Sequence, residues 1–215
     1  MLKALIFDFD GLILDTETPL IEAYGDVYAA HGLVFDRALF ERQIGHADYT
    51  FDPWKPFGKQ ADLVSLEAER RVHNRERTLR QAVLPGVKEL IEAAFAEGLR
   101  LGVASNSGHE WVEGHLQRLE LHRYFSYFGC KGDTPAPKPE PHIYRHVVNQ
   151  LGMNPAECVA LEDSTTGVRA AKRASLRVVA VPNVSTHAHD YQEADWVVGS
   201  MLEVTPTLLR KRFGL

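Results

Sequence analysis

Short apolar runs recur along the chain and predict the strands of a sheet. The four strongest runs are KALIFDF (3–9), RLGVAS (100–105), CVALED (158–163) and RVVAVP (177–182). Continuous apolar runs of this length are typical of strands that are buried on both faces of a parallel sheet. Two weaker runs, at residues 124–129 and 195–199, predict further strands.

Helical patterns lie between the predicted strands. Residues 86–98 and 165–175 form two such segments, and Gly98 stands in the position that commonly follows a helix C-terminus. Because strands alternate with helices, the sequence predicts an α/β fold built on a doubly wound parallel sheet.

Residues 16–82 interrupt this alternation and predict a helical insertion after the first strand. Apolar and aromatic residues repeat there at helical spacing: Leu20, Ala23, Tyr24, Val27, Tyr28 and His31. A second helical run at 63–82 is highly charged, and we expect it to present a broad solvated face. Between the two helices, residues 45–59 contain glycine, proline and aromatic residues, a pattern that predicts an irregular loop.

Composition and charge exclude several classes of protein. The 215 residues are 45% hydrophobic and 25% charged, as expected for a soluble globular protein with a sizeable core. A net charge of -5 gives no basic field for nucleic acid or for an anionic membrane surface. Asp8 and Asp10 interrupt the first apolar run, which therefore predicts neither a signal peptide nor a membrane span, and we expect a cytosolic protein. Cys130 and Cys158 are expected to be reduced, buried thiols.

Acidic residues stand at the carboxyl ends of two predicted strands. Asp8 and Asp10 follow the first strand, and side-chain alternation would direct both to the same side if the strand continued. Glu162 and Asp163 end another strand, so a second acidic pair is expected at the same edge. Like charges about 4 Å apart repel by roughly 4 kcal/mol at an effective dielectric constant near 20, so this cluster needs a cation or large pKa shifts. Oxygen ligands without histidine or cysteine favour Mg²⁺.

Two other segments offer hydrogen-bond donors and a cation. Ser105, Asn106 and Ser107 follow the strand at 100–105, where hydroxyls, an amide and turn N–H groups can bind a phosphate. Lys138 lies between prolines, which restrict the backbone and so aim the ammonium group. Acids, donors and a lysine at one sheet edge together favour phosphoryl transfer through an aspartate.

Four segments resemble, in order, the sequence motifs of the haloacid dehalogenase superfamily: DFDGLILDTE (8–17), VASNS (103–107), APKPEPHIY (136–144) and LEDSTTGVRAA (161–171). The first motif, the helical insertion behind it and the EDS form of the fourth motif are similar to the beta-phosphoglucomutase-like branch. The resemblance implies a Rossmann-like catalytic core, residues 1–15 and 83–215, with a small α-helical cap inserted at 16–82.

The resemblance also implies a role for each site residue. Asp8 would be the nucleophile that forms an aspartyl phosphate, and Asp10 would be the general acid and base. Ser105 and Lys138 would hold the phosphate, and Asn106 is a further candidate for this contact. Mg²⁺ would bind the Asp8 carboxylate, the Asp10 carbonyl and Asp163, with Glu162 as a direct or outer ligand.

Three functions agree with these residues. The first is a Mg²⁺-dependent phosphatase of a small organic monophosphate, such as a sugar phosphate or phosphoglycolate. The second is a phosphosugar mutase, which is disfavoured because no arginine lies between Arg42 and Arg70, and because Leu20 stands where the mutases have a histidine. The third is a non-enzymatic phospho-acceptor switch, which Asp10 and the long insertion disfavour. Candidates to contact the leaving group are His46, Asp48, Tyr49 and Trp54.

Overall fold

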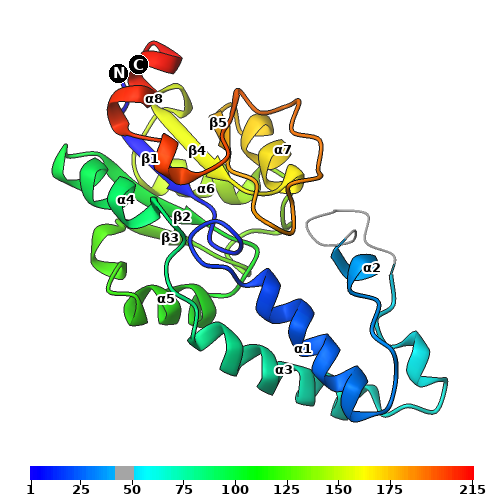
Figure 1. Ribbon diagram of the computed structural model, residues 1–215. Helices are drawn as coiled ribbons and strands as arrows, with labels where there is room; N and C mark the ends of the chain where they lie inside the picture. Colours follow the sequence, from blue (N-terminus) through cyan, green and yellow to red (C-terminus); the bar gives the residue numbers. More distant parts are fainter. Residues whose placement is uncertain (42–50) are drawn as a thin grey trace.

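A parallel sheet of six strands forms the centre of the protein (Figure 1). The computed structural model describes residues 1–41 and 51–215, so His46, Asp48 and Tyr49 lie outside the described residues. The strands are β1 (Ala4–Phe7), β2 (Arg100–Ala104), β3 (Tyr127–Gly129), β4 (Cys158–Glu162), β5 (Arg177–Ala180) and β6 (Trp196–Val197). All six predicted strands are therefore confirmed, including the two weaker ones.

The strand order β3-β2-β1-β4-β5-β6 confirms the predicted doubly wound, Rossmann-like sheet. From β1 the chain moves outward to β2 and β3, and it then returns to place β4 on the other side of β1. In the central register, Ile6 pairs with Gly102 and with Ala160. The order reverses between β1 and β4, and in open α/β sheets this point is where ligands bind, at the carboxyl ends of the strands.

Helices cover both faces of the sheet, as its apolar strands require. One face packs on α4 (Val87–Ala96), α5 (His109–Arg118) and α8 (Pro206–Phe213), and the other on α6 (His142–Gln150) and α7 (Thr165–Arg173). Side chains alternate along β1, so Leu5 and Phe7 enter the first apolar cluster while Ala4 and Ile6 enter the second. The predicted helices at 86–98 and 165–175 are thus confirmed, and each holds its neighbouring strands in the core.

The described part of residues 16–82 contains helices and no strand. These helices are α1 (Glu17–Ala30), α2 (Arg37–Glu41) and α3 (Leu63–Leu79), and a short 3₁₀ turn spans Lys55–Phe57. In Figure 1, α1 and α3 lie side by side and extend away from the sheet. Arg77 joins them, because its guanidinium donates hydrogen bonds to Asp26 at 2.7–2.9 Å and to Glu22 at 2.6 Å. The helical content agrees with the predicted cap, whose domain boundaries remain a prediction.

Aromatic rings pack together inside this helical region. The Trp54 ring lies 5.2 Å from the ring of Tyr24 and 5.5 Å from that of Phe57. Tyr28 and Phe40 belong to the same cluster, with ring centroids 6.2 Å apart. Trp54, a predicted candidate for substrate contact, is therefore held by packing against other rings.

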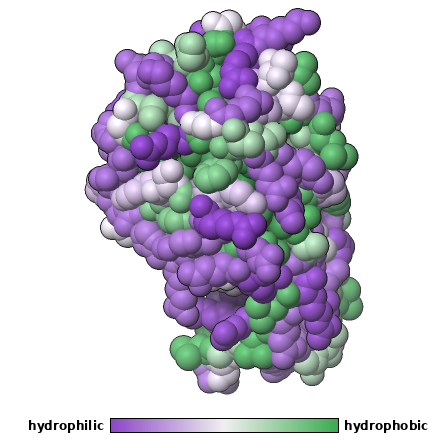
Figure 2. Space-filling model, turned by 90° about the vertical axis from the view of Figure 1, so that its left-hand side faces the viewer, coloured by the Kyte–Doolittle hydropathy of each residue, from purple (hydrophilic) through white to green (hydrophobic). Residues whose placement is uncertain are grey.

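The exterior and the cysteines agree with the composition. Figure 2 shows one face of the molecule, where hydrophilic residues predominate and hydrophobic residues are dispersed among them. No helix within the described ranges is both long enough and apolar enough to span a membrane. Cys130 and Cys158 are buried free thiols, as predicted, and burial raises the pKa of each to about 12.

Further 3₁₀ turns connect elements of the core. They span His122–Tyr124, Pro155–Glu157 and Met201–Glu203.

Candidate active site

Three carboxylates meet where the strand order reverses. Asp8 directly follows β1, Glu162 is the last residue of β4, and Asp163 comes next in the chain. One oxygen from each side chain lies within 4.8 Å of the others, and all three residues are buried. The structure thus brings together the two acidic segments that the sequence places at neighbouring strand ends.

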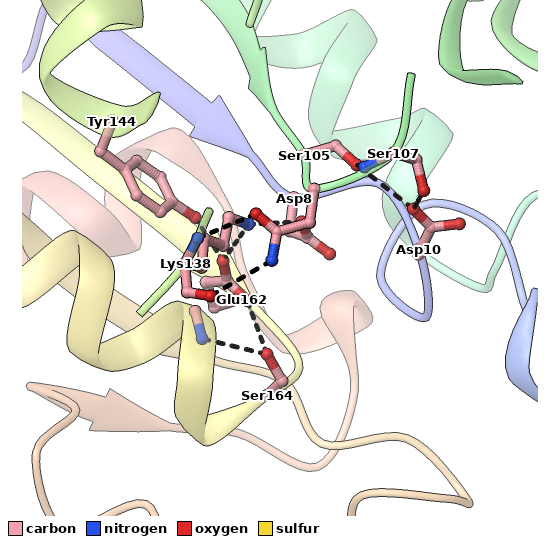
Figure 3. A network of polar contacts seen from close by, with 10 residues as sticks. Asp8, Asp10, Ser105, Ser107, Lys138, Tyr144, Glu162 and Ser164 are labelled. Carbon is pink, nitrogen blue, oxygen red and sulfur yellow. Dashed lines mark hydrogen bonds and ion pairs between the residues drawn. The ribbon is translucent and has the colours of Figure 1, made fainter. Parts of the chain in front are cut away.

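Lys138 supplies the cation of this cluster (Figure 3). Its Nζ lies 2.5 Å from Asp8 Oδ1 and 2.6 Å from Glu162 Oε1, and the ammonium group stands 5.0 Å from the centroid of the Tyr144 ring. Burial acts to lower the pKa of Lys138, but the charges of Asp8 and Glu162 outweigh burial and hold that pKa above its ordinary value. The lysine is therefore a permanent positive charge at the site.

Glu162 is held in place from three directions. Its Oε1 also accepts a hydrogen bond from the Tyr144 hydroxyl, and Ser164 Oγ lies 3.4 Å from its Oε2. Gly167, in α7, packs directly against the carboxylate, since a Cβ built there would lie 2.0 Å from it. Ser164 caps α7 by accepting a hydrogen bond from Gly167 N at 3.1 Å. The glycine of the fourth motif is thus required by the close approach of helix and carboxylate.

Asp163 is linked to the loop that follows β1. Asn183 Nδ2 donates hydrogen bonds to Asp163 Oδ2 at 2.9 Å and to the Gly11 carbonyl at 3.0 Å. Gly11 has a φ of +77°, and a Cβ built there would lie 2.3 Å from Asp163 Oδ2. The Tyr191 hydroxyl donates to the Asp163 carbonyl. The loop after β1 and the end of β4 are therefore fixed relative to each other.

The charges of the cluster are not balanced by Lys138 alone. The pKa of Asp8 is raised to about 8, chiefly by burial, with Lys138 opposing the rise and the charges of Glu162 and Asp10 adding to it. Burial also raises the pKa of Asp163 well above its ordinary value, with added repulsion from Glu17 and Asp8. An all-oxygen donor set with excess negative charge fits a hard divalent cation such as Mg²⁺, with Asp8, Asp163 and Glu162 as the residues that could hold it.

Asp10 faces a different set of partners from Asp8. Its Oδ2 accepts hydrogen bonds from Ser107 Oγ at 2.7 Å and from Ser105 Oγ at 3.2 Å. Its Oδ1 accepts one from Trp111 Nε1 at 2.9 Å. The strand ends at Phe7, so side-chain alternation does not continue to Asp10, whose carboxylate lies beside the serines (Figure 3). The sequence predicts that Asp8 and Asp10 point to the same side only if the strand continues to Asp10. The strand ends before Asp10, so that prediction does not apply.

The asparagine beside the serines contacts the lysine segment. Asn106 Oδ1 accepts a hydrogen bond from the Lys138 backbone N–H at 2.9 Å, and its Nδ2 lies 3.4 Å from the Lys138 carbonyl oxygen. These contacts hold the backbone that carries the buried ammonium group. Phosphate binding by Asn106, Ser105 and Lys138 stays a prediction.

The sequence reasoning missed four residues near the site: Glu17, Trp111, Tyr144 and Asn183. Asn183 follows β5 closely, so the same strand-end argument could have found it. Glu17 begins α1, and burial raises its pKa to about 7, with Asn183 lowering it and Asp15 raising it. Trp111 and Tyr144 reach the site from helices, where helical spacing does not distinguish them from core residues, and the motif at 136–144 includes Tyr144 without indicating a role for it.

Comparison with known proteins places the chain in a family. Residues 5–181 match the haloacid dehalogenase-like hydrolases, and the chain belongs to this family. YhcW of Bacillus subtilis (strain 168) is 38% identical over 213 residues, which cover 97% of this chain and 96% of that protein. Hexitol phosphatase B of Escherichia coli (strain K12) is 33% identical over 187 residues, 83% of each chain. The predicted haloacid dehalogenase-like phosphatase class is confirmed.

Solved structures share the fold. The crystal structure of a CbbY variant from Rhodobacter sphaeroides, in complex with xylulose 1,5-bisphosphate, matches with a TM-score of 0.78 and 27% sequence identity. The match covers 94% of this chain and 96% of that one. A structure from Thermotoga maritima described as a beta-phosphoglucomutase matches with a TM-score of 0.83 and 25% sequence identity over 97% of this chain and 99% of that one, which agrees with the predicted branch of the family.

Proposed function

We propose that this protein is a Mg²⁺-dependent phosphatase that hydrolyses a small phosphorylated carbohydrate through an aspartyl phosphate on Asp8. The observation that carries the proposal is the pairing of Asp8 with Lys138 at 2.5 Å inside a buried acidic cluster, while Asp10 stands apart on its own hydrogen-bond donors. One aspartate thus lies beside the Lys138 ammonium group, which offsets part of its negative charge, and the second accepts hydrogen bonds from two hydroxyls and an indole. This division suits a nucleophile and a proton carrier.

In the first step, an Asp8 carboxylate oxygen attacks phosphorus and the bond from phosphorus to the ester oxygen breaks. Lys138 offsets negative charge on Asp8 and on the phosphoryl oxygens, and the Ser105 hydroxyl can donate to the same oxygens. Asp10 gives its proton to the leaving oxygen, so the product leaves as an alcohol.

In the second step, water attacks the phosphorus of the aspartyl phosphate. Asp10 takes a proton from that water, the bond between Asp8 and phosphorus breaks, and inorganic phosphate is released. Asp8 regains its carboxylate and Asp10 its proton, so the enzyme is restored. Both steps need Asp10 to remain close to phosphorus in one orientation.

A bound Mg²⁺ would supply positive charge for the Asp8 carboxylate and for the phosphoryl oxygens. Asp8, Asp163 and the Asp10 carbonyl are the proposed ligands, with Glu162 as a direct or outer one. The Oε1 atom of Glu162 is already engaged by Lys138 and Tyr144, which supports an outer role for that atom.

The proposed substrate class rests on relatives of this chain. One relative is named hexitol phosphatase B, and a CbbY structure contains a sugar bisphosphate. The partner we infer is therefore a small phosphorylated metabolite, and neither nucleic acid nor a membrane. A cytosolic location remains our prediction from the sequence.

A phosphosugar mutase is the alternative. A mutase must hold the second phosphate of a sugar bisphosphate with a cation while water is kept out. Lys55 and Lys59 are the lysines near the predicted cap loop, whereas the mutases carry an arginine there. A phosphatase needs only water as acceptor, and it is the function that the residues of this chain favour.

The proposal is tested by phosphate release from a panel of hexitol, sugar, glycolate and nucleotide monophosphates. We expect activity on at least one carbohydrate phosphate with Mg²⁺ present, loss of that activity after exhaustive chelation, and recovery when Mg²⁺ is returned. Full turnover in the chelated protein would rule out the metal requirement. Activity on none of the panel would rule out the substrate class.

A further inference from the structure

The proton carrier of the proposed phosphatase accepts three hydrogen bonds from side chains, and the three donors differ in kind. The hydroxyls of Ser105 and Ser107 share Asp10 Oδ2, whereas the indole N–H of Trp111 alone reaches Oδ1, at 2.9 Å. A hydroxyl can rotate to another acceptor, but an indole has one N–H in a fixed direction and cannot accept in return. The direction of the carboxyl group thus depends most on the donor that cannot turn.

Trp111 is itself held by packing. It lies in the first turn of α5 and is partly buried against the core cluster of that sheet face. Its ring meets the His115 ring edge to face, with centroids 4.5 Å apart, and His115 stacks on Phe9 at 6.2 Å. Phe9 stands between Asp8 and Asp10 in the chain. The Trp111 indole is therefore packed, through His115, against the same loop after β1 that carries the Asp10 carboxylate.

Substrate binding reduces the number of hydroxyl groups that can donate to Asp10. Ser105 has one hydroxyl proton, so it cannot donate to a phosphate oxygen and to Asp10 at the same time. When Ser105 turns to the phosphate, Asp10 keeps the Ser107 hydroxyl on one oxygen and the Trp111 indole on the other. The indole then holds Oδ1 through both chemical steps.

We propose that Trp111 is a positioning residue that sets the direction of the Asp10 carboxyl group for proton transfer. Without the indole N–H, the Asp10 carboxyl group can rotate about its Cβ–Cγ bond. The transferable proton then points at the leaving oxygen for a smaller fraction of the time. The inference rests on the proposed function, because it assigns to Trp111 a part in the proton transfers of that reaction.

The leaving group distinguishes positioning from general packing. An alkoxide leaving from a sugar phosphate needs a proton as the ester bond breaks, whereas 4-nitrophenolate is a stable anion and leaves without one. The value of kcat/KM reports the steps up to that bond cleavage. A defect in aiming the proton should therefore lower kcat/KM for the sugar phosphate far more than for 4-nitrophenyl phosphate.

The test compares Trp111→Phe with the wild type on a sugar phosphate and on 4-nitrophenyl phosphate. Phenylalanine keeps an aromatic ring against His115 and removes the N–H. We expect kcat/KM to fall about tenfold or more for the sugar phosphate, part of the roughly 10²–10⁴-fold that general acid catalysis contributes, and less than about threefold for 4-nitrophenyl phosphate. Trp196→Phe is the matched control: Trp196 lies in β6 at the sheet edge, and we expect both values to stay unchanged.

A second variant guards against a folding defect in Trp111→Phe. Benzothienylalanine at position 111 has the shape of tryptophan with sulfur in place of the N–H, and we expect the same selective loss. Equal losses on both substrates, or no loss on either, would overturn the positioning role while leaving the phosphatase intact. If the wild type hydrolyses neither substrate, the proposed function fails and the positioning role fails with it.

Discussion

Lys138 Nζ lies 2.5 Å from Asp8 Oδ1, although 130 residues separate the two in the chain. The same nitrogen lies 2.6 Å from Glu162 Oε1, so one ammonium group joins carboxylates at the carboxyl ends of two neighbouring strands. Asp163 adds a third buried carboxylate, and one oxygen from each of the three side chains lies within 4.8 Å of the others. One ammonium group does not balance three carboxylates. The remaining negative charge is the physical basis for the metal dependence that we propose and for the predictions on Asp8.

Asp8→Asn should abolish turnover and leave the fold intact. An amide is a poor nucleophile, so we expect phosphate release to fall roughly a thousandfold or more, as when a covalent nucleophile is deleted. Asp190→Asn is a matched control that should leave turnover unchanged. Asp190 lies in an exposed loop, where its carboxylate accepts a hydrogen bond from the Gln192 backbone N–H. A near-normal rate in the Asp8 variant would exclude it as the nucleophile.

Asp10→Asn should separate proton transfer from metal binding. The substitution keeps the backbone carbonyl that would bind Mg²⁺ and removes the transferable proton. We expect turnover to fall by about 10²–10⁴-fold and Mg²⁺ affinity, measured by titration calorimetry, to change little. A large loss of Mg²⁺ affinity would instead make the Asp10 side chain a ligand.

The stability of the metal-free protein should depend on pH through Asp8. Its pKa is raised from 3.8 to about 8 in the folded protein, so between these values the folded state holds a proton that the unfolded state has lost. Stability from this group is therefore lost as pH rises from about 4 to about 8. Asp8→Asn removes the effect, and in chelator its thermal midpoint should exceed that of the wild type more at pH 8 than at pH 5.

The Asp8 comparison reports Asp8 together with the repulsion that Asp8 exerts on Asp163, whereas Glu17, whose pKa is also raised, is present in both proteins. A chain of this size shifts its midpoint by roughly 2–4 °C for each kcal/mol. Adding Mg²⁺ at pH 8 should raise the midpoint of the wild type more than that of the variant. A gap between the two proteins that is the same at both pH values would contradict the raised pKa of Asp8.

Gly167→Ala should destabilise the protein even though the glycine lies in a helix. The added Cβ would lie 2.0 Å from the Glu162 carboxylate, so either the helix or the carboxylate must move. We expect a loss of about 1–3 kcal/mol in the free energy of unfolding, together with reduced activity. Gly114→Ala is the matched control, because Gly114 also lies in a helix but has open space around its Cβ position.

The sign of the effect should differ between the two glycines. Replacing a helical glycine by alanine in open space gains about 0.5–1 kcal/mol, so Gly114→Ala should raise the thermal midpoint. If both substitutions stabilised the protein, the close contact between α7 and Glu162 would be excluded.

The strands and their ends could be predicted from the sequence because two patterns coincide there. An apolar run fixes the strand, and the first charged residue behind it falls at the sheet edge, as Asp8 and Glu162 do. In a parallel sheet all such edges lie together, so the cluster follows from topology alone. The prolines on both sides of Lys138 restrict its backbone, and this pattern predicts a cation directed to one place.

Other features could not be predicted, for separate physical reasons. The direction of Asp10 depends on where β1 ends, and an apolar run that includes Phe9 does not reveal an end at Phe7. Trp111 and Tyr144 project from helices, and their spacing matches that of core residues. The hydrogen bonds between Asn106 and the Lys138 backbone join two loops, whose conformations no periodic pattern describes.

The reaction products should identify a hydrolase. From a labelled glucose 1-phosphate or glucose 6-phosphate we expect inorganic phosphate and no interconversion of the two esters, because no arginine lies between Arg42 and Arg70, the stretch where the mutases hold the second phosphate of a bisphosphate. The assay follows both products from the same sample over time. Isomerised sugar phosphate that forms faster than free phosphate would establish a mutase and refute the phosphatase proposal.

The position of β1 has a consequence for the synthesis of this protein. β1 lies in the middle of the sheet between β2 and β4, and its four residues are all buried. It leaves the ribosome before the other five strands, yet β4 on its second side is complete only when residues 158–162 have been made. Until then one edge of an apolar strand is open to pairing with other chains. A growing chain therefore depends on protection of this edge, and truncation before residue 158 should yield an aggregating product.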